Sequence, residues 1–471
     1  MTIATTNPAT GEVLERFEPL SEAGIDATIG RADEASDVLR RTGIDTRAGW
    51  MRAAAALLEA ERADLARTMT TEMGKTLRAA EAEVSKCARA CRFYADHAAS
   101  FLADEPVDPE AVGARRAYTR YRPLGPVLAV MPWNFPVWQV IRFAAPALMA
   151  GNVGLLKHAS NVPRTALYLG ELFGRAGFPP GAFQALLIGS DAVERVIRDP
   201  RVRAATLTGS EGAGRAVATV AGEEIKPTVL ELGGSDPFVV TPAADLDEAV
   251  RVATVARVQN NGQSCIAAKR FIVVGDVADE FERRFVQRMA ALRVGDPLDD
   301  ATDVGPLATE SGLADLEAQV DDAVGAGAEV LCGGERPAGP GWYYPPTVLR
   351  GVTPEMRMFR EEVFGPVAPV YRVADLDGAI ELANATTFGL GANIWTTDAA
   401  EQDRFVTEVA SGAVFVNGMT TSYPELPFGG VKASGYGREL GVQGIRAFCN
   451  ATTVWVGGAD DGEAPTTARA E

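Results

Sequence analysis

The first hundred residues carry apolar positions at helical spacing. From 21 to about 102 the pattern is helical, and it includes alanine-rich amphipathic stretches at 47–69 and 75–95. After a proline-containing break at 105–109, residues 117–122 alternate as the residues of an exposed strand do. The pattern therefore predicts a helical opening section followed by an edge or arm strand.

Short apolar runs follow, and helix-sized stretches separate them. The runs occupy 127–131, 153–157, 185–188, 204–208 and 229–232. Such alternation is typical of βαβ units in a parallel sheet. A second region of the same kind has predicted strands near 271–274 and 413–416 and predicted helices near 278–292 and 375–385. The predicted fold class is therefore α/β.

Length, composition and charge narrow the class of protein. The 471 residues suffice for two or three domains, and a content of 47% hydrophobic and 23% charged residues is ordinary for a globular protein. No apolar run reaches the length of a membrane span, and the N-terminus lacks the basic and apolar parts of a signal peptide, so a cytoplasmic protein is expected. The net charge of −18 disfavours nonspecific binding to nucleic acid or anionic membranes.

Cys265 is the candidate nucleophile. It follows the polar, flexible run 260–264, although a cysteine that merely packs in the core remains an open reading of these residues alone. The five cysteines are widely spaced and include no C-x-x-C pair, so we predict neither a disulfide framework nor a metal site. Because the chain has only two histidines, Glu231 is the preferred candidate for the base that releases an acylated thiol.

The predicted parallel sheet suggests a nucleotide site, because such sheets bind ligands at the carboxyl ends of their strands. The usual G-x-G-x-x-G signature is missing, and the nearest segment is Thr-Gly-Ser-Glu-Gly-Ala-Gly at 208–214, which begins a predicted helix. Serine and glycine at a helix start serve as caps as well as phosphate ligands. This segment alone therefore leaves both roles open.

Seven motifs occur in a fixed order along the chain. They lie at 132–136, 157–160, 208–210, 231–234, 262–265, 361–366 and 427–435. Their residues are, in turn, PWNFP, KHAS, TGS, ELGG, GQSC, EEVFGP and PFGGVKASG. Together they resemble the aldehyde dehydrogenase superfamily over about 7–456, and the stretches 157–160 and 422–428 are similar to those of its NADP-using succinate-semialdehyde dehydrogenases.

The resemblance implies covalent catalysis by three residues. Cys265 attacks the aldehyde carbon, and the side-chain amide of Asn134 stabilises the negative oxygen of the thiohemiacetal together with the backbone N–H of Cys265. Loss of a hydride leaves a thioester. Glu231 is then the general base for the water that hydrolyses this thioester.

The resemblance also implies a set of cofactor-binding residues, which are Trp133, Asn134, Lys157, His158, Ala159, Ser160, Gly209, Ser210, Leu232, Glu362 and Phe364. Lys157 reaches the adenosine ribose, whereas Glu362 and Phe364 hold the nicotinamide ribose and ring. Ser160 stands where NAD-preferring relatives often carry a glutamate, and a serine beside Lys157 can bind a 2′-phosphate. NADP is therefore the expected cofactor, with NAD as the alternative.

Three residues are expected to bind the substrate. Arg142 and Ser422 match the arginine and the hydroxyl that semialdehyde-oxidising relatives use for a distal carboxylate, while Gln259 stands where some relatives place a second arginine. The expected reaction is the oxidation of succinate semialdehyde to succinate. Other aliphatic or aromatic aldehydes, a nonenzymatic nucleotide-binding role on the same fold and a cofactor-free thioesterase remain as alternatives.

The resemblance finally implies a Rossmann-like cofactor domain, an α/β catalytic domain and a small β oligomerisation element. Because exposed strand edges tend to pair, we expect a homodimer or a homotetramer. The parts are the cofactor domain at 1–104 and 124–231, the catalytic domain at 232–448, the oligomerisation element at 105–123 and 449–457, and a mobile tail at 458–471.

Overall fold

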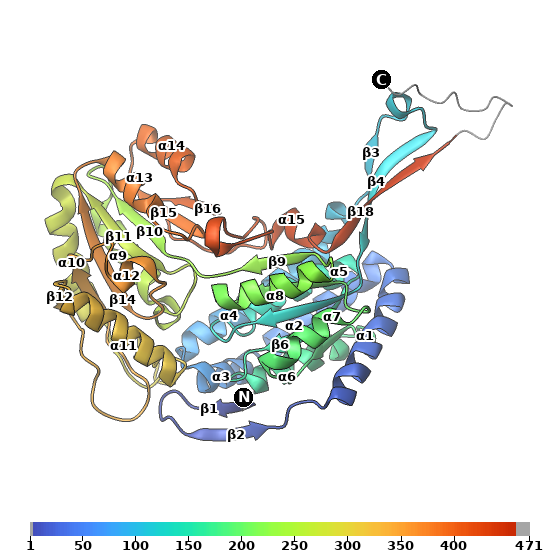
Figure 1. The fold of residues 1–471 in the computed structure, drawn as a ribbon, viewed down its shortest axis with the longest axis horizontal. Helices are drawn as coiled ribbons and strands as arrows, with labels where there is room; N and C mark the ends of the chain where they lie inside the picture. The colour runs from blue at the N-terminus through green and yellow to red at the C-terminus, as the bar shows by residue number, and fades with distance from the viewer. Residues whose placement is uncertain (1–2, 458–471) are drawn as a thin grey trace.

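The computed structural model describes residues 3–457, and it shows two α/β lobes with a β arm that projects from the body (Figure 1). The six-stranded sheet of one lobe has the order β17-β9-β8-β5-β6-β7, and the seven-stranded sheet of the other has the order β12-β13-β14-β11-β10-β15-β16. Most neighbouring strands are parallel, as the predicted α/β class requires. The predicted 458–471 tail lies outside the described residues.

Five strands of the six-stranded sheet occur where the apolar runs predicted them, although β7 begins and ends a few residues earlier; the sixth strand, β17, was not predicted. The bounds are β5 (Pro126–Met131), β6 (Val153–His158), β7 (Phe183–Ala185), β8 (Ala204–Thr208), β9 (Thr228–Glu231) and β17 (Gly435–Tyr436). The second sheet comprises β10 (Asp236–Val240), β11 (Ala268–Val274), β12 (Glu329–Cys332), β13 (Thr347–Arg350), β14 (Val367–Val373), β15 (Gly391–Trp395) and β16 (Ala413–Val416).

The helical opening section is confirmed as four helices. They are α1 (Glu22–Arg41), α2 (Ile44–Ala60), α3 (Arg62–Met73) and α4 (Leu77–Phe101). Ser21 and Thr76 cap α1 and α4, since each side chain accepts from a backbone N–H of the first turn. The stretch 47–69 is divided at Glu61, which ends α2 and precedes α3. None of the helices within 3–457 has the length and apolarity needed to cross a bilayer.

Further helices cover both sheets. Around the first sheet lie α5 (Trp138–Ala150), α6 (Pro163–Arg175), α7 (Val193–Arg198) and α8 (Glu211–Glu223), with α15 (Gly441–Arg446) beside α5. Around the second lie α9 (Leu246–Val258), α10 (Ala278–Ala290), α11 (Glu310–Gly325), α12 (Arg357–Arg360), α13 (Leu376–Asn384) and α14 (Ala399–Glu408). Every residue of α5 is buried, so this helix lies inside the first lobe rather than on its surface.

The strands of the second sheet bury side chains on both faces. Along β10, Phe238 and Val240 join one hydrophobic cluster whereas Val239 joins the other. Successive side chains of a strand point to opposite faces, so this lobe has two cores separated by its sheet. The first lobe instead has one continuous core.

An N-terminal hairpin completes the first lobe, and the sequence pattern did not predict it. Strands β1 (Ile3–Thr6) and β2 (Val13–Phe17) pair antiparallel beneath α3 and α6 (Figure 1). Thr5 donates to the buried carboxylate of Glu72, which also accepts from the backbone N–H of Arg164 and from the N–H and hydroxyl of Thr165. These four hydrogen bonds join the hairpin to α3 and α6.

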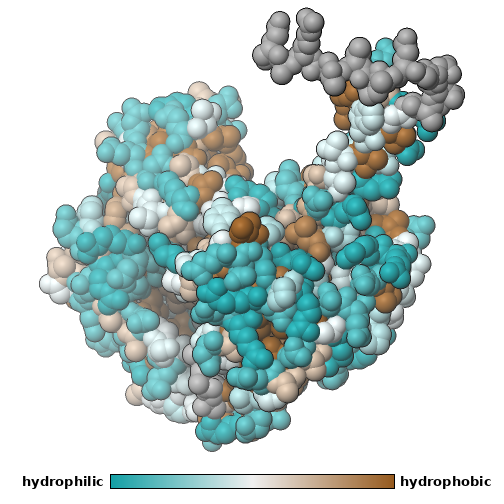
Figure 2. Space-filling view, turned by 45° about the vertical axis from the view of Figure 1, so that its right-hand side comes forward, coloured by the Kyte–Doolittle hydropathy of each residue, from teal (hydrophilic) through white to brown (hydrophobic). Residues whose placement is uncertain are grey.

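The arm is a three-stranded antiparallel sheet made of β3 (Glu105–Val107), β4 (Arg116–Pro123) and β18 (Cys449–Val456). The predicted edge strand is in fact the central strand, because β3 pairs with one side of β4 and β18 pairs with the other. Apolar side chains are exposed along the arm (Figure 2), and Val107, Val112 and Trp455 are 44%, 45% and 54% exposed. The arm is therefore a sheet with two outer edges and uncovered apolar surface.

The short strand β17 joins the C-terminal part of the chain to the first sheet. It pairs antiparallel with β9, where Gly435 faces Glu231. Gly435 has φ +115°, and a Cβ there would lie 2.0 Å from the carbonyl oxygen of Leu230. The side chain of Ser434 donates to the carbonyl of Gly233 at 2.6 Å. Apart from β17, each sheet lies within one of the predicted domain ranges.

Candidate active site

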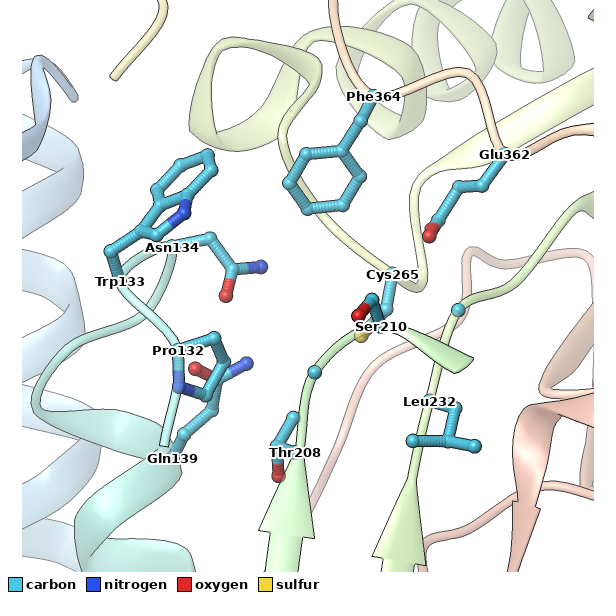
Figure 3. A pocket seen from close by; sticks show the side chains of 12 residues that line it. Pro132, Trp133, Asn134, Gln139, Thr208, Ser210, Leu232, Cys265, Glu362 and Phe364 are labelled. Carbon is cyan, nitrogen blue, oxygen red and sulfur yellow. The ribbon is translucent and has the colours of Figure 1, made fainter. Parts of the chain in front are cut away.

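A cavity of about 260 Å³ lies at the carboxyl ends of β5, β8 and β9, where the two lobes meet (Figure 3). This is the position at which parallel sheets bind ligands. Figure 3 shows Asn134, Cys265 and Phe364 facing a common space from three different segments. The lining residues are Pro132, Trp133, Asn134, Gln139, Thr208, Gly209, Ser210, Leu232, Gly233, Cys265, Glu362 and Phe364.

Cys265 lies at the end of a loop whose backbone has an unusual conformation. Asn260, Asn261 and Gly262 have φ values of +55°, +58° and +75° in succession. Asparagine tolerates this left-handed region better than most residues, and glycine adopts it freely. A Cβ on Gly262 would lie 2.3 Å from the backbone of Gly365. The sequence Asn-Asn-Gly is therefore what this tight turn requires.

Side chains from several elements hold the loop in place. Asn261 donates to the carbonyls of Gly74 and Pro306, at 2.8 and 3.0 Å, and accepts from the N–H of Gly305. Arg257, on α9, donates to the carbonyl of Gly262 at 2.7 Å. These contacts satisfy buried carbonyl groups that no regular strand or helix pairs, so they stabilise the strained turn.

Lys269 fixes the residues immediately around the nucleophile. Its buried amino group donates to the carbonyls of Ser264 and Cys265, at 2.8 and 2.7 Å, and forms an ion pair with Glu362 at 3.0 Å. Lys269 lies on β11, and Glu362 belongs to the segment between α12 and β14. A single cation thus connects the nucleophile loop to a second wall of the cavity.

The thiol of Cys265 is partly buried and faces the cavity. Burial raises the pKa of this thiol to about 12, while the charges of Lys269 and Arg142 oppose that rise. Because a thiolate is the reactive form, this raised pKa favours the protonated and less reactive form of Cys265 at neutral pH.

Asn134 follows β5 and approaches the same loop. Its side-chain amide donates to the carbonyl of Gln263 at 3.1 Å, and its own carbonyl accepts from the side chain of Asn260 at 2.7 Å. Asn134 and Cys265 both line the cavity, 131 positions apart in the numbering and yet joined through this loop. The structure therefore brings together two of the three predicted catalytic residues in the lining.

Glu231, the third, is the last residue of β9 and is 1% exposed. Neither carboxylate oxygen has a hydrogen-bond partner among the described residues. Burial raises the pKa of Glu231 well above its usual value, and the neighbouring carboxylate of Glu439 raises it further, against the opposing charge of Arg142. An unpartnered buried carboxyl group with a raised pKa is suited to proton transfer.

Arg142 lies beside this carboxyl group. Its guanidinium is buried, forms an ion pair with Glu439, and donates to the hydroxyl of Thr208 at 3.1 Å. It also lies over the ring of Phe428, 4.7 Å from the ring centre. We expected a guanidinium open to a substrate carboxylate; the structure instead gives Arg142 an internal counter-ion, and its role in substrate binding stays a prediction.

The expected nicotinamide end of the cofactor site is present in the cavity. Glu362 accepts from the N–H of Gly234 at 3.2 Å, and Leu232 and Gly233 line the cavity beside it. Trp133 and Phe364 stand edge to face, with ring centres 5.8 Å apart. Their binding roles remain predictions, but all of these residues border one space.

The expected phosphate end begins at Gly209 and Ser210, which also line the cavity. Ser210 caps α8, because its hydroxyl accepts from the N–H of Ala213 at 3.3 Å. A helix start of this kind presents backbone N–H groups and a positive dipole to an anion. The sequence left two roles open for this segment, a helix cap and a phosphate ligand. Ser210 can serve as the cap while the N–H groups at the start of α8 remain available to a phosphate.

The expected adenosine residues lie at and after the end of β6. Lys157 is 9% exposed, and burial lowers its pKa while Asp191 opposes this. Ala159 and Ser160 are only partly buried. The ring of His158 is bonded to the backbone nearby: its Nε2 donates to the carbonyl of Pro136 at 2.9 Å and its Nδ1 accepts from the N–H of Ala159, and its part in cofactor binding stays a prediction.

Of the two other expected substrate residues, Ser422 is buried and accepts from Lys86 and from Trp138, each at 2.9 Å. Gln259 begins the turn before the nucleophile and is absent from the cavity lining. The sequence arguments did not single out Lys86, Lys269 or Gln139. Each is a polar residue in a strand or an amphipathic helix, and nothing in the local pattern marks it as part of a site.

Comparisons with known proteins agree with this geometry. The model of the aldehyde dehydrogenase family matches residues 1–454. A succinate-semialdehyde dehydrogenase [NADP(+)] of Mycobacterium avium (strain 104) is 65% identical, over 98% of this chain and 98% of that protein. A protein of Mycobacterium ulcerans (strain Agy99), succinate-semialdehyde dehydrogenase [NADP(+)] 1, is 64% identical over 97% of this chain and its whole length.

Solved structures share the fold. A succinic semialdehyde dehydrogenase from Streptococcus pyogenes, crystallised with NADP+ as the cofactor, superposes with a TM-score of 0.94 at 37% identity and covers 97% of this chain and 100% of that chain. The structure of Gox0499, solved to explain its cofactor and substrate selection, has a TM-score of 0.95 at 40% identity, with the same coverage.

Proposed function

The chain belongs to the aldehyde dehydrogenase family, and we propose that it oxidises succinate semialdehyde to succinate with NADP+ as the hydride acceptor. The observation that carries the proposal is the meeting of Asn134, Cys265 and Glu362 around one cavity, with Glu231 buried at the end of an adjoining strand. The relatives named for this reaction support the choice of substrate and cofactor.

The reaction begins at Cys265. The thiol gives its proton to a water molecule, and the resulting thiolate attacks the aldehyde carbon to form a thiohemiacetal whose oxygen carries the negative charge. Lys269 and Arg142 favour the thiolate electrostatically, since both oppose the rise in the pKa of Cys265. The hydrogen bonds that fix Ser264 and Cys265 hold the sulfur in one direction toward the cavity.

The negative oxygen of the thiohemiacetal needs hydrogen-bond donors. Asn134 reaches the loop through its amide nitrogen, which donates to Gln263 and has a second N–H. That second N–H and the backbone N–H of Cys265 are the proposed donors. Removing one such donor typically lowers kcat by ~10²–10³.

The thioester that follows is hydrolysed with Glu231 as the base. Its unpartnered oxygens can accept a proton from water, and its raised pKa makes the ionised carboxylate a stronger base than an ordinary glutamate. Glu439 and Arg142 lie next to it, so the proton that Glu231 accepts stays close to a buried ion pair rather than to bulk water.

NADP+ fits the residues that are present. The cavity ends at the start of α8, whose backbone N–H groups can bind a pyrophosphate, and the rings of Trp133 and Phe364 give it an aromatic lining elsewhere. Glu362 and Leu232 would hold the nicotinamide riboside, and Trp133, Lys157, Ala159, Ser160, Gly209 and Ser210 the remainder. When bound, the nicotinamide accepts the hydride, and the chain's residues supply position and charge.

The preference for NADP+ rests on Ser160 and Lys157. A serine at this position places no carboxylate against a 2′-phosphate, and Lys157 supplies a cation without a carboxylate within ion-pairing distance among the described residues. NAD+ remains the alternative cofactor.

A steady-state assay of the purified protein tests the proposal. We expect kcat/KM for succinate semialdehyde with NADP+ to exceed that with NAD+, and to exceed that for hexanal or benzaldehyde, by roughly 100-fold. Equal values of kcat/KM for the three aldehydes would reject succinate semialdehyde as the specific substrate, while the family assignment would stand.

Two further properties belong to the proposal. The unpaired outer edges of the arm and its exposed Val107 and Trp455 support a homo-oligomer, a dimer or a tetramer. A reaction that depends on a free thiol, in a chain whose five cysteines are all unpaired, suits the reducing cytoplasm.

A further inference from the structure

A lysine far along the sequence from the predicted substrate residues contacts one of them in the folded chain. Lys86 belongs to α4, and its amino group is 2.9 Å from the hydroxyl of Ser422 and 4.1 Å from the centre of the Trp138 indole. Trp138 begins α5, which also carries Gln139 in the cavity lining. Lys86 and Ser422 are 336 residues apart in the sequence and meet only in the folded chain.

Ser422 is held in an orientation that leaves its O–H available. Its oxygen accepts from the amino group of Lys86 and from the indole N–H of Trp138. A hydroxyl has two acceptor lone pairs and one donor hydrogen, so these two contacts occupy both lone pairs. No residue within 3–457 accepts the hydrogen of Ser422, and the ammonium of Lys86 and the indole N–H of Trp138 polarise that O–H toward an incoming anion.

Lys86 carries a charge that the described residues do not neutralise at close range. The nearby carboxylate of Glu83 is ion-paired with Lys75 and accepts from the N–H groups of Val137 and Trp138. No carboxylate among residues 3–457 lies within ion-pairing distance of Lys86 itself. Burial lowers the pKa of Lys86 to about 8, and Arg142 adds to the positive potential around it.

The other nearby cation is less available. Arg142 already has Glu439 as a counter-ion inside the protein, and Thr208 accepts a further guanidinium N–H. Gln259, six residues before the nucleophile, contributes no charge where some relatives of this family place an arginine. A substrate carboxylate that enters this end of the site therefore meets Lys86 as its unmatched cation.

We propose that Lys86 binds the distal carboxylate of the substrate, together with the hydroxyl of Ser422. It thereby supplies the cation that the second arginine supplies in some relatives and that this chain lacks at position 259. The inference rests on the proposed function, because it identifies the group that recognises the carboxylate of succinate semialdehyde. The indole of Trp138 stabilises the bare ammonium by a cation–π contact until the anion arrives.

The test compares the anionic substrate with butanal, a neutral aldehyde of the same chain length. The variant Lys86→Met keeps the length of the side chain and removes its charge. We expect KM for succinate semialdehyde to rise about 30-fold with kcat changed less than about 3-fold, and a far smaller change in kcat/KM for butanal. Turnover of butanal also shows that the variant is folded.

Arg89→Met is the matched control. Arg89 lies one turn along α4 from Lys86, is an exposed cation, and pairs with Glu425 on the segment that carries Ser422. Its removal lowers the general positive potential of this face by the same single charge. We expect its KM for succinate semialdehyde to stay within about 2-fold of the wild-type value, as is usual for an exposed ion pair.

The outcomes separate the two proposals. If wild-type enzyme prefers succinate semialdehyde to butanal and Lys86→Met keeps that preference, Lys86 does not bind the carboxylate and the proposed function stands. If wild-type enzyme shows no such preference, the proposed function is wrong; inhibition of butanal oxidation by succinate then tests Lys86 directly, and equal inhibition constants for wild type and Lys86→Met reject it.

Discussion

The loop that carries Cys265 and the strand end that carries Glu231 differ in how their polar groups are satisfied. In the loop, Asn261, Arg257 and Lys269 provide donors for buried carbonyl groups that the turn leaves unpaired. At the strand end, both oxygens of Glu231 lack a hydrogen-bond partner among the described residues. The hydrogen bonds of the loop fix its backbone, whereas the two carboxylate oxygens of Glu231 remain able to accept hydrogen bonds from a ligand or water.

The difference follows from the chemistry of each group. A nucleophile must approach one carbon from one direction, so the loop around it is fixed at the expense of backbone strain at Asn260 and Asn261. A base must accept and release a proton, and hydrogen bonds to its charged form would lower its pKa and weaken it. The lack of partners at Glu231 thus agrees with its proposed role.

The largest effect should come from removing the base. Glu231→Gln preserves size and removes the acceptor, so we expect kcat to fall by ~10³ while one equivalent of NADPH still forms rapidly. Stopped-flow absorbance of NADPH measures both phases. Two outcomes would contradict the assignment of Glu231 to thioester hydrolysis. One is steady turnover at the wild-type rate, and the other is loss of the rapid phase together with the steady rate.

A smaller loss should follow when the loop is released. Asn261→Ala removes three hydrogen bonds and places a Cβ-bearing residue without a polar side chain at φ +58°, and we expect kcat/KM to fall by about 10- to 100-fold. Asn261→Gly removes the same bonds but accepts the backbone conformation, so its loss should be smaller. Similar steady-state values for the two variants would show that backbone strain plays no part.

The protonation of Cys265 should appear in its reactivity. Because burial raises the pKa of this thiol to about 12, the rate of alkylation by iodoacetamide in the unliganded protein should rise about 10-fold per pH unit between about pH 7 and 10. Mass spectrometry of the peptide that contains Cys265 gives the rate. A plateau below about pH 9 would mean that the resting nucleophile is a thiolate.

The smallest expected effect is a change in thermal stability, and its measurement compares the buried carboxylates of Glu231 and Glu72. The pKa of Glu231 is raised in the folded protein, so the folded state binds the extra proton and loses stability as pH rises above the unfolded pKa. Glu231→Gln should therefore raise Tm at pH 8 by about 1–3 °C, and the gain should vanish below about pH 4.

Glu72→Gln is the control for that measurement. Glu72 is also buried with a raised pKa, but it accepts four hydrogen bonds that join the N-terminal hairpin to two helices. An amide cannot accept all four, so this substitution should lower Tm by several degrees. A gain in Tm for Glu72→Gln would show that burial alone, and not the absence of partners, determines the sign.

Much of the fold was predictable, because the parallel strands are continuous apolar runs with helices between them. The meeting of Asn134, Cys265 and Glu362 followed from motifs in a fixed order. What local pattern could not supply were pairings between distant segments. The central position of β4 depends on β18, more than three hundred residues later, and nothing near residues 116–123 indicates it.

The sequence indicated some of the charged residues of the site, but it did not indicate which of them form ion pairs. Arg142 was identified for its position, yet its partner Glu439 lies far along the chain and was not considered. Lys86 is one polar position on an amphipathic helix, and its burial depends on Trp138 and Ser422. His158 was expected to contact the cofactor, and its two ring nitrogens are hydrogen-bonded to a backbone carbonyl and a backbone N–H that the sequence did not indicate.

The pairing of β17 with β9 also has a consequence for the order in which the first sheet can be completed during synthesis. The base Glu231 ends β9, but its strand gains the neighbour on that side only from Gly435 and Tyr436, and Ser434 reaches Gly233 across 201 residues. Contacts of such separation form late in folding. A nascent chain that extends only to β16 therefore lacks the residues that pair with β9, and the strand that carries Glu231 is complete on that side only after residues 434–436 have been made.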